Sequence, residues 1–380
     1  RTNVHRTMIP MVDLRNQYQK IRKEIHDSIL RVMESCTFIG GPEVDAFSEE
    51  LAQWMGVRYT IPVANGTDAL QIALMASGLH AGDEVIVPAF TYVASAEVIA
   101  LLGLKPVMID VDPYTFNITP ELVEKAITSR TKAIIPVHLF GQSAPMEEIL
   151  EVAREYELFV IEDNAQSLGS GYSCHDGSFR LTGTESPLSC TSFFPTKNLA
   201  CMGDGGAITT NNEELAALAL KIARHGQSRK YHHDVIGCNS RLDALQAAIL
   251  RIKLRHLNIY LEARREAARI YNEGLQDIPW LQTPVCVSGY QHTYNQYTLR
   301  VQEKHRDSLA TFLKEQEIPT MIYYPLPLYR QKAFSSFFNE SPLPVTEQLC
   351  REVLSLPMHT ELSEETQQLI IQKIHEFKAD

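Results

Sequence analysis

Apolar residues recur at three- and four-residue steps in the first part of the chain. Between Asp13 and Met33 the apolar positions are Leu14, Tyr18, Ile21, Ile25, Ile29 and Val32. This spacing is the period of an amphipathic helix. The segment from Pro42 to Met55 predicts a second helix.

Short apolar runs then alternate with segments of helical length. The apolar runs are Tyr59 to Ala64, Glu84 to Pro88, Pro106 to Asp110, Ala133 to His138 and Phe159 to Glu162. The helical segments between them are Asp68 to Ser77, Ser95 to Leu102, Pro120 to Ile127 and Met146 to Tyr156. This alternation predicts parallel strands joined by right-handed crossover helices. Ligands of such sheets bind at the carboxyl ends of the strands.

The pattern changes in the second half of the chain. A strand (Ala207 to Thr210) and a capped helix (Glu213 to Arg224) precede a long charged helix from Leu242 to Glu273. Further pieces are predicted as strands at Tyr297 to Val301 and Thr320 to Tyr323, and as helices at Arg306 to Gln316 and Glu364 to Phe377. We therefore expect an N-terminal helical segment (1–35), a large α/β domain (36–250), and a linking helix with a small C-terminal α+β domain (251–380).

Composition narrows the class of protein. Hydrophobic residues make up 44% and charged residues 21%, which is ordinary for a globular protein. The net charge of -11 argues against a nucleic-acid or membrane partner recognised by bulk charge. The seven cysteines form no CxxC pair and predict neither a metal site nor a disulfide framework. With no signal-type or membrane-spanning run, we expect a cytoplasmic protein in which the polar residues 1–7 form a loose tail.

Two motifs follow predicted strands. Asn65-Gly66-Thr67-Asp68 opens a helix, so backbone amides and the Thr67 hydroxyl could bind a phosphate at the helix N-terminus. The same residues could simply be a capped Asn-Gly turn. Asp163 ends an apolar strand, where its carboxylate could stabilise a protonated pyridine nitrogen or merely cap the next turn.

A third motif carries Lys197, thirty-four residues after Asp163. Most lysines are solvated surface charges, but a lysine held in a pocket can lose its proton and form an imine with an aldehyde. A nicotinamide-dependent dehydrogenase is disfavoured because no GxGxxG follows the first strand, and neither GxxxxGK[ST] nor HExxH is present.

In order, these motifs resemble those of the DegT/DnrJ/StrS family of sugar aminotransferases, over roughly residues 9 to 360. The segments that carry the resemblance are Asn65 to Leu70, Glu162 to Gln166, Ser192 to Leu199, Gly203 to Ala207, and Cys238 to Asp243 with Gln246 to Ala248. The resemblance implies a fold-type-I, pyridoxal-phosphate-dependent transferase with a three-layer α/β/α, mainly parallel sheet. It also implies a homodimer with the active site at the subunit interface.

The resemblance assigns a role to each matching residue. Lys197 would carry pyridoxal 5'-phosphate as a Schiff base and move a proton during turnover, when the cofactor becomes pyridoxamine 5'-phosphate. Asp163 would keep the ring nitrogen protonated. The other cofactor contacts would be Gln166 at the ring hydroxyl, Tyr92 on the ring face, Gly66, Thr67 and Ser192 at the phosphate, and Asn239 from the second subunit.

The resemblance also suggests substrates. L-glutamate is the family's usual donor, and the retained Lys197 favours amino transfer over the dehydration catalysed by members with His there. The loop around Tyr323 and Tyr324, together with Thr37 to Val44, looks closest to enzymes that aminate C3 of a UDP-linked 2-acetamido-3-oxo-glucuronate, for surface polysaccharide or lipopolysaccharide biosynthesis.

Three substrate contacts and two other functions stay open. Arg241, Tyr323 and Tyr324 could hold the sugar nucleotide, or Arg241 could cap the long helix or pair within it while the tyrosines only pack. The alternative enzyme aminates C4 of a dTDP- or UDP-linked 4-keto-6-deoxysugar. The alternative of another class is a non-catalytic sensor or regulatory module that binds the cofactor.

Overall fold

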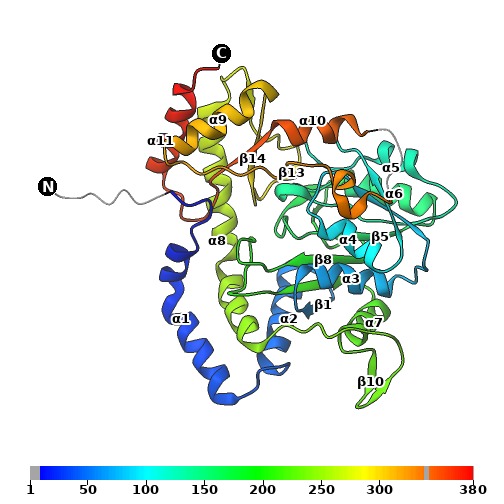
Figure 1. The fold of residues 1–380 in the computed structure, drawn as a ribbon. Coiled ribbons are helices and arrows are strands. Elements are labelled where there is room, and N and C mark those ends of the chain that lie inside the picture. The colour runs from blue at the N-terminus through cyan, green and yellow to red at the C-terminus, as the bar shows by residue number, and fades with distance from the viewer. Residues whose placement is uncertain (1–8, 338–341, 380) are drawn as a thin grey trace.

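A seven-stranded sheet forms the centre of the larger part of the molecule (Figure 1). The structure, a computed structural model, describes residues 9–337 and 342–379, so the predicted tail at residues 1–7 lies outside it. The strands, in sheet order, are β1 (Tyr59–Val63), β9 (Gly206–Thr210), β8 (Leu188–Ser192), β5 (Phe159–Asp163), β4 (Thr131–Ile134), β2 (Glu84–Pro88) and β3 (Lys105–Ile109). Only β9 runs antiparallel to its neighbours, which confirms the mainly parallel sheet.

Helices cover both faces of this sheet. One apolar core joins it to α3 (Gly66–Ala76), α4 (Ala94–Leu101) and α7 (Glu213–Ala223). Cores on the other face join it to α5 (Pro120–Ala126), α6 (Met146–Glu155) and α2 (Pro42–Met55). The predicted three-layer α/β/α architecture is therefore confirmed.

Asparagine and threonine side chains set where several of these helices begin. The Asn65 side chain accepts a hydrogen bond from the Asp68 amide at 2.8 Å, and Asn212 accepts one from the Leu215 amide at 3.0 Å. Thr119 caps α5, whose first residue is a proline. Such caps satisfy amides that have no acceptor inside the helix.

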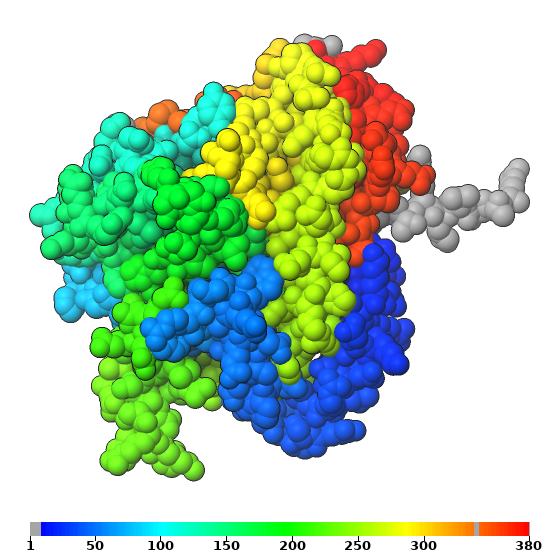
Figure 2. Space-filling model, turned by 180° about the vertical axis from the view of Figure 1, so that it is seen from behind, coloured from blue at the N-terminus to red at the C-terminus, as the bar shows by residue number. Residues whose placement is uncertain are grey.

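The 32-residue helix α8 (Ala244–Leu275) links the two parts of the molecule and runs the length of the view in Figure 1. The N-terminal helix α1 (Leu14–Ser35) lies alongside it, with Ile21 and Ile25 packed against Ile249 and Ile252. Seen from behind, α8 runs down the middle of the molecule, and the N-terminal helix and the C-terminal helix lie along the same side of it (Figure 2).

The C-terminal elements form a second layered core around the far end of α8. Their sheet has the order β12 (Leu281–Gln282), β14 (Tyr297–Val301), β15 (Val353–Leu356). Its helices are α9 (Glu303–Glu315), α10 (Pro344–Glu352) and α11 (Glu364–Glu376). These elements match the predicted α+β composition, while the residue boundaries proposed for the domains stay a prediction.

Two of the predicted strands were wrong in part or in whole. Thr320 to Tyr323 forms no strand and makes only one isolated bridge, between Met321 and Ser355. Prolines at 319 and 325 remove backbone donors on both sides of this segment. β4 ends at Ile134 rather than His138, because Pro136 cannot donate to a ladder.

The remaining short elements went unpredicted. A small sheet joins β13 (Tyr290–Gln291), β6 (Gly171–Ser173) and β7 (Phe179–Leu181). A hairpin of β10 (Gln227–Arg229) and β11 (His232–His233) projects beyond α7 in both views (Figures 1 and 2). Single 3₁₀ turns lie at η1 (Leu139–Gly141), η2 (Leu328–Arg330) and η3 (Lys332–Phe334). No described helix has the length and apolar character to cross a bilayer.

Candidate active site

The carboxyl ends of β1, β5 and β8 bring the predicted motifs together at one edge of the sheet. Gly66 and Thr67 follow β1, Asp163 ends β5, and Ser192 ends β8. They surround a cavity of about 590 Å³, which Lys197 also lines. The cavity contains every predicted cofactor and substrate residue except two: it holds Gly66, Thr67, Tyr92, Asp163, Gln166, Ser192, Lys197, Tyr323 and Tyr324.

Two glycines let three chain segments converge at one end of this cavity. A Cβ on Gly66 would lie 2.6 Å from the Ser192 Cβ, and a Cβ on Gly206 would lie 2.5 Å from the Asn65 carbonyl carbon and oxygen. Gly66 and Thr67 occupy the first turn of α3, where amides lack acceptors inside the helix. Together with the hydroxyls of Thr67 and Ser192, these amides form a cradle suited to a phosphate.

Asp163 lies deeper in the cavity and is only 5% exposed. The Ser95 hydroxyl donates to its Oδ2 at 2.7 Å, and the Ala165 amide donates to its Oδ1 at 3.1 Å. Its backbone is fixed by bonds to the Pro136 carbonyl and the His138 amide. A rigid carboxylate at this position can pair with a protonated ring nitrogen.

Lys197 occupies the same cavity as Asp163. Burial lowers the pKa of Lys197 to about 8, and the negative charge of Asp163 opposes that shift. A larger fraction of the amine is therefore neutral near pH 7 than in an exposed lysine. This is the state that a nucleophilic amine requires.

A fully buried hydrogen-bonded pair, Glu162 and His138, supports β5 directly behind Asp163. Glu162 accepts hydrogen bonds from His138 Nε2 at 2.8 Å, the Gly183 amide at 2.7 Å and the Ser186 hydroxyl at 2.6 Å. The Ala144 amide donates to His138 Nδ1, so the His138 proton lies on Nε2. Burial opposes ionisation of Glu162, but these hydrogen bonds hold its pKa below the usual value.

The side-chain amide of Gln166 has one possible orientation. The Phe140 amide donates to Gln166 Oε1 at 2.7 Å, which leaves Nε2 to donate to the Tyr324 hydroxyl at 3.1 Å. Burial raises the pKa of Tyr324 well above its ordinary value, so its hydroxyl keeps its proton. The Gln166–Tyr324 pair therefore presents hydrogen-bond donors to the cavity.

Tyr92 stands at the mouth of the cavity, 56% exposed, with its ring centroid 6.4 Å from that of Tyr324. An exposed aromatic face can stack on a flat ligand ring.

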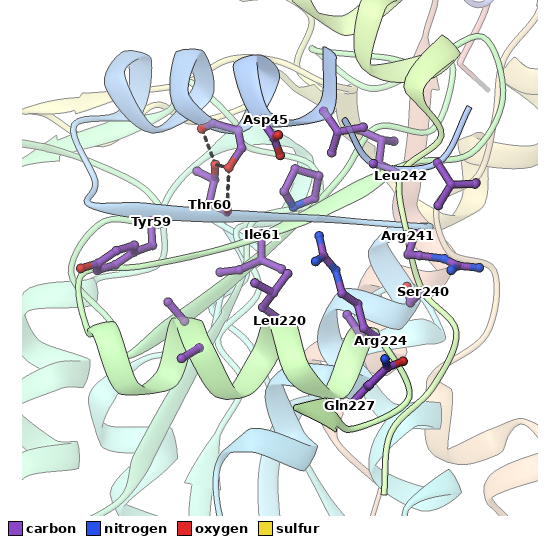
Figure 3. A pocket seen from close by; sticks show the side chains of 18 of the residues that line it. Asp45, Tyr59, Thr60, Ile61, Leu220, Arg224, Gln227, Ser240, Arg241 and Leu242 are labelled. Atoms are coloured by element: carbon purple, nitrogen blue, oxygen red, sulfur yellow. Dashed lines mark hydrogen bonds between the residues drawn. The ribbon is translucent and has the colours of Figure 1, made fainter. Parts of the chain in front are cut away.

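Asn239 and Arg241 do not line this cavity within one chain. Arg241 lies at the rim of a separate cavity of about 900 Å³ between α2, β1 and α7 (Figure 3). Arg224 reaches into that cavity, and its backbone forms an isolated bridge with Asn239. Arg241 makes no ion pair in the described chain, so the expectation that it pairs within the long helix finds no support there.

Sequence reasoning missed Asp204 and Gln296, which line the Lys197 cavity, and Ser95, whose hydroxyl contacts Asp163 from outside the lining. Asp204 lies inside a motif that was recognised, so its signal was present. Gln296 comes from the start of the C-terminal sheet, where its amide donates to the Phe140 carbonyl at 3.3 Å. No local pattern connects Gln296 to the motifs of the large domain.

Comparisons with known proteins agree with this geometry. The DegT/DnrJ/EryC1/StrS aminotransferase family matches residues 19–375. A Geobacillus stearothermophilus protein named pleiotropic regulatory protein is 47% identical over 372 residues, 97% of this chain and 98% of its own length. The UDP-2-acetamido-2-deoxy-3-oxo-D-glucuronate aminotransferase of Pseudomonas aeruginosa is 47% identical over 356 residues, 93% of this chain and 95% of that enzyme. A crystal structure of S. venezuelae DesV in complex with a ketimine intermediate superposes with a TM-score of 0.94 at 37% identity, covering 98% of this chain and all of that one (100%).

Proposed function

The chain belongs to the DegT/DnrJ/EryC1/StrS aminotransferase family, and we propose that it moves the amino group of L-glutamate to C3 of UDP-2-acetamido-2-deoxy-3-oxo-glucuronate. The coarser activity, amino transfer to a sugar with pyridoxal phosphate, follows from the family and its relatives. Lys197 and Asp163 in one cavity beside a phosphate cradle are the observation that carries the proposal.

The cavity fits pyridoxal phosphate from end to end. Gly66, Thr67 and Ser192 would hold the phosphate, Asp163 the ring nitrogen, and Gln166 the ring hydroxyl. When bound, the cofactor supplies an aldehyde that joins to an amine and a ring that withdraws electrons from the substrate carbon.

Each side chain has a separate task in this proposal. The Lys197 amine, already easily deprotonated, anchors the cofactor and afterwards moves a proton at the reacting carbon. Asp163 keeps a proton on the ring nitrogen, while the Gln166–Tyr324 pair donates to the ring oxygen. Tyr92 covers one face of the ring and limits the approach of water.

The C3 assignment is supported by two observations. The Pseudomonas aeruginosa relative named for that substrate matches nearly the whole chain at 47% identity. Tyr323 and Tyr324, in the loop that resembles such enzymes, line the cavity beside Lys197. The product would serve surface polysaccharide or lipopolysaccharide synthesis.

The site requires a second copy of the chain in this proposal. Asn239 and Arg241 lie away from their own Lys197 cavity, so a partner would supply Asn239 to the phosphate and Arg241 to the sugar nucleotide. Arg224, Arg229 and Arg241 have no ion-pair partner within the described residues, and Tyr231 and Ile236 are 81% and 87% exposed. Surfaces of this kind favour burial against a partner.

The substrate test uses a panel of nucleotide-linked keto sugars with L-glutamate as donor. NMR of the products locates the new amine. We expect an amine at C3 of the 2-acetamido-3-oxo-glucuronate, whereas an amine at C4 of a 4-keto-6-deoxysugar would replace the C3 assignment with the alternative activity. Lys197→Ala should abolish turnover with every substrate.

A regulatory role is the second candidate, favoured by the name of the Geobacillus stearothermophilus relative, pleiotropic regulatory protein. The visible spectrum of the purified protein separates the two. A band that shifts when L-glutamate is added supports the transaminase. A bound cofactor whose spectrum stays unchanged with glutamate and with the whole sugar panel would favour the regulatory module.

A further inference from the structure

Ser95 is a fully buried hydroxyl (0% exposed) in the first turn of α4. Its hydroxyl donates to Asp163 Oδ2 at 2.7 Å, across a sequence separation of 68 residues. We propose that Ser95 is a positioning residue for the cofactor ring: it holds the Asp163 carboxylate in the orientation that meets the ring nitrogen. This inference rests on the proposed role of Asp163.

The donors on Asp163 fix the plane of its carboxylate. A carboxylate on a flexible side chain rotates easily about its last torsion. Here the Ala165 amide holds Oδ1 at 3.1 Å and Ser95 holds Oδ2 at 2.7 Å, so both oxygens are fixed. Without the Ser95 hydroxyl, only one of these two constraints remains.

The direction of the Ser95 hydrogen bond is determined by chemistry. An ionised carboxylate only accepts, so the single hydroxyl proton of Ser95 points at Asp163. The Thr91 hydroxyl lies 3.4 Å from the Ser95 oxygen and can donate to it. The hydrogen bonds from Thr91 to Ser95 and from Ser95 to Asp163 therefore reach the carboxylate from one side. A protonated ring nitrogen would approach the carboxylate from another side.

The same short segment carries the residue that stacks on the ring. Tyr92 directly follows Thr91 and lies three residues before Ser95. The segment 91–95 thus fixes the cofactor ring in two directions, through the ring face at Tyr92 and through the ring nitrogen by way of Ser95 and Asp163.

A purely structural role predicts a different response. If Ser95 only satisfies a buried carboxylate, its loss lowers the stability of the protein and weakens every bound ligand alike. If Ser95 orients Asp163 toward a ring nitrogen, its loss matters only for a ligand that has that nitrogen.

The test compares two cofactors on the apo-protein. One is pyridoxal phosphate, and the other is its analogue with carbon in place of the ring nitrogen. For Ser95→Ala we expect about tenfold weaker binding of pyridoxal phosphate, because a hydrogen bond to a charged group is lost. Binding of the carbon analogue should be unchanged. The Ser95→Cys side chain is similar in size to serine but a weaker donor. Its affinity for pyridoxal phosphate should therefore lie between those of the unmodified protein and Ser95→Ala.

Controls separate this inference from the proposed function. Ser28→Ala removes a buried hydroxyl on α1, which contributes nothing to the cavity, and should leave both affinities unchanged. Asp163→Asn should weaken pyridoxal phosphate selectively. If it does so while Ser95→Ala and Ser95→Cys do not, only the Ser95 inference is overturned; if Asp163→Asn has no selective effect, the proposed site itself fails. Equal weakening of both cofactors by Ser95→Ala would assign Ser95 a structural role and overturn the inference.

Discussion

Two lysines of this chain are buried enough for their pKa values to fall to about 8, Lys197 and Lys253. In both cases burial is the main cause. Lys253 is buried on α8 and does not line the cavity that contains Asp163. The lowered pKa makes an amine reactive, but only the position of Lys197 brings that amine to the phosphate cradle.

The first prediction concerns the pH dependence of covalent cofactor loading at Lys197. Only the neutral amine reacts, so the loading rate should rise about tenfold per pH unit below the pKa and level off above about 8. Stopped-flow absorbance after mixing apo-protein with pyridoxal phosphate measures this rate. A lysine peptide in water is the control and should keep rising toward its ordinary pKa. A rate for the protein that still rises with the peptide's slope above pH 9, roughly one unit past the folded value, would contradict the account.

The second prediction concerns Gln166, the hydrogen-bond donor proposed for the ring oxygen of the cofactor. Gln166→Glu keeps an oxygen for the Phe140 amide but replaces the donor toward Tyr324 with a negative charge. We expect kcat/KM to fall about a hundredfold, the usual cost of removing a donor from a developing negative charge. Gln166→His keeps a hydrogen-bond donor, so its kcat/KM should fall by less than about tenfold. Equal losses in steady-state assays of the two variants would show that the donor is irrelevant.

At the scale of elements, the Glu162–His138 pair ties β5 to the loops on either side of it. Gln at position 162 would turn an amide donor toward groups that already donate, among them His138 Nε2 and the Gly183 amide. We expect Glu162→Gln to lower the free energy of unfolding in urea by about 3 kcal/mol, as when one partner of a buried pair is removed. The control is Glu185→Gln. Glu185 Oε1 lies 3.6 Å from Arg180 Nε in an exposed ion pair, so this change should alter the free energy of unfolding by less than about 1 kcal/mol.

The same pair sets the sign of an acid dependence. The folded pKa of Glu162 is lowered, so its contribution is complete above the ordinary value of 4.5 and disappears as the pH falls through the folded value. The difference in stability between the unmodified protein and Glu162→Gln should therefore shrink as the pH falls below the ordinary value of 4.5 and through the lowered folded pKa. A gap that widens on acidification would show that Glu162 is held neutral.

Elements with a strong period could be predicted from the sequence, and others could not. The helix at Pro42–Met55 was predicted with its observed ends because its apolar face repeats cleanly. The strand β8, Leu188–Ser192, went unrecognised because it is rich in Ser and Thr, although it lies in the middle of the sheet. Its hydroxyls find partners only in the folded protein, for example Thr191 on the Asn164 carbonyl.

The same division applies to the site. Residues at or just beyond the carboxyl ends of strands, such as Asp163 and Gly66, could be found because parallel strands bring these ends together. Ser95 and Gln296 could not, because tertiary contacts alone bring a helix and the C-terminal sheet to the cavity.

At the scale of the whole molecule, the separation of Asn239 from its own cavity predicts sharing of sites between subunits. Lys197→Ala and Asn239→Ala chains, each impaired alone, should regain activity when unfolded together and refolded as mixed dimers. Random pairing places one intact site in half of the dimers, so about a quarter of the normal activity is expected.

The matched control for this experiment pairs Lys197→Ala with Asp163→Asn. Both residues line the same cavity of one chain, so every mixed dimer would have a defect in each site. This mixture should stay inactive. No recovery with Asn239→Ala would place Asn239 in the site of its own chain. Recovery in the control would show that Lys197 and Asp163 of one chain serve different sites.

The central claim is that the cofactor is joined to Lys197, opposite Asp163. Borohydride reduction of the loaded protein followed by peptide mass spectrometry tests this most directly, because reduction makes the bond permanent. The account predicts a phosphopyridoxyl group on Lys197 and none on Lys253. A modified Lys253, or any other lysine, with Lys197 left free would contradict it.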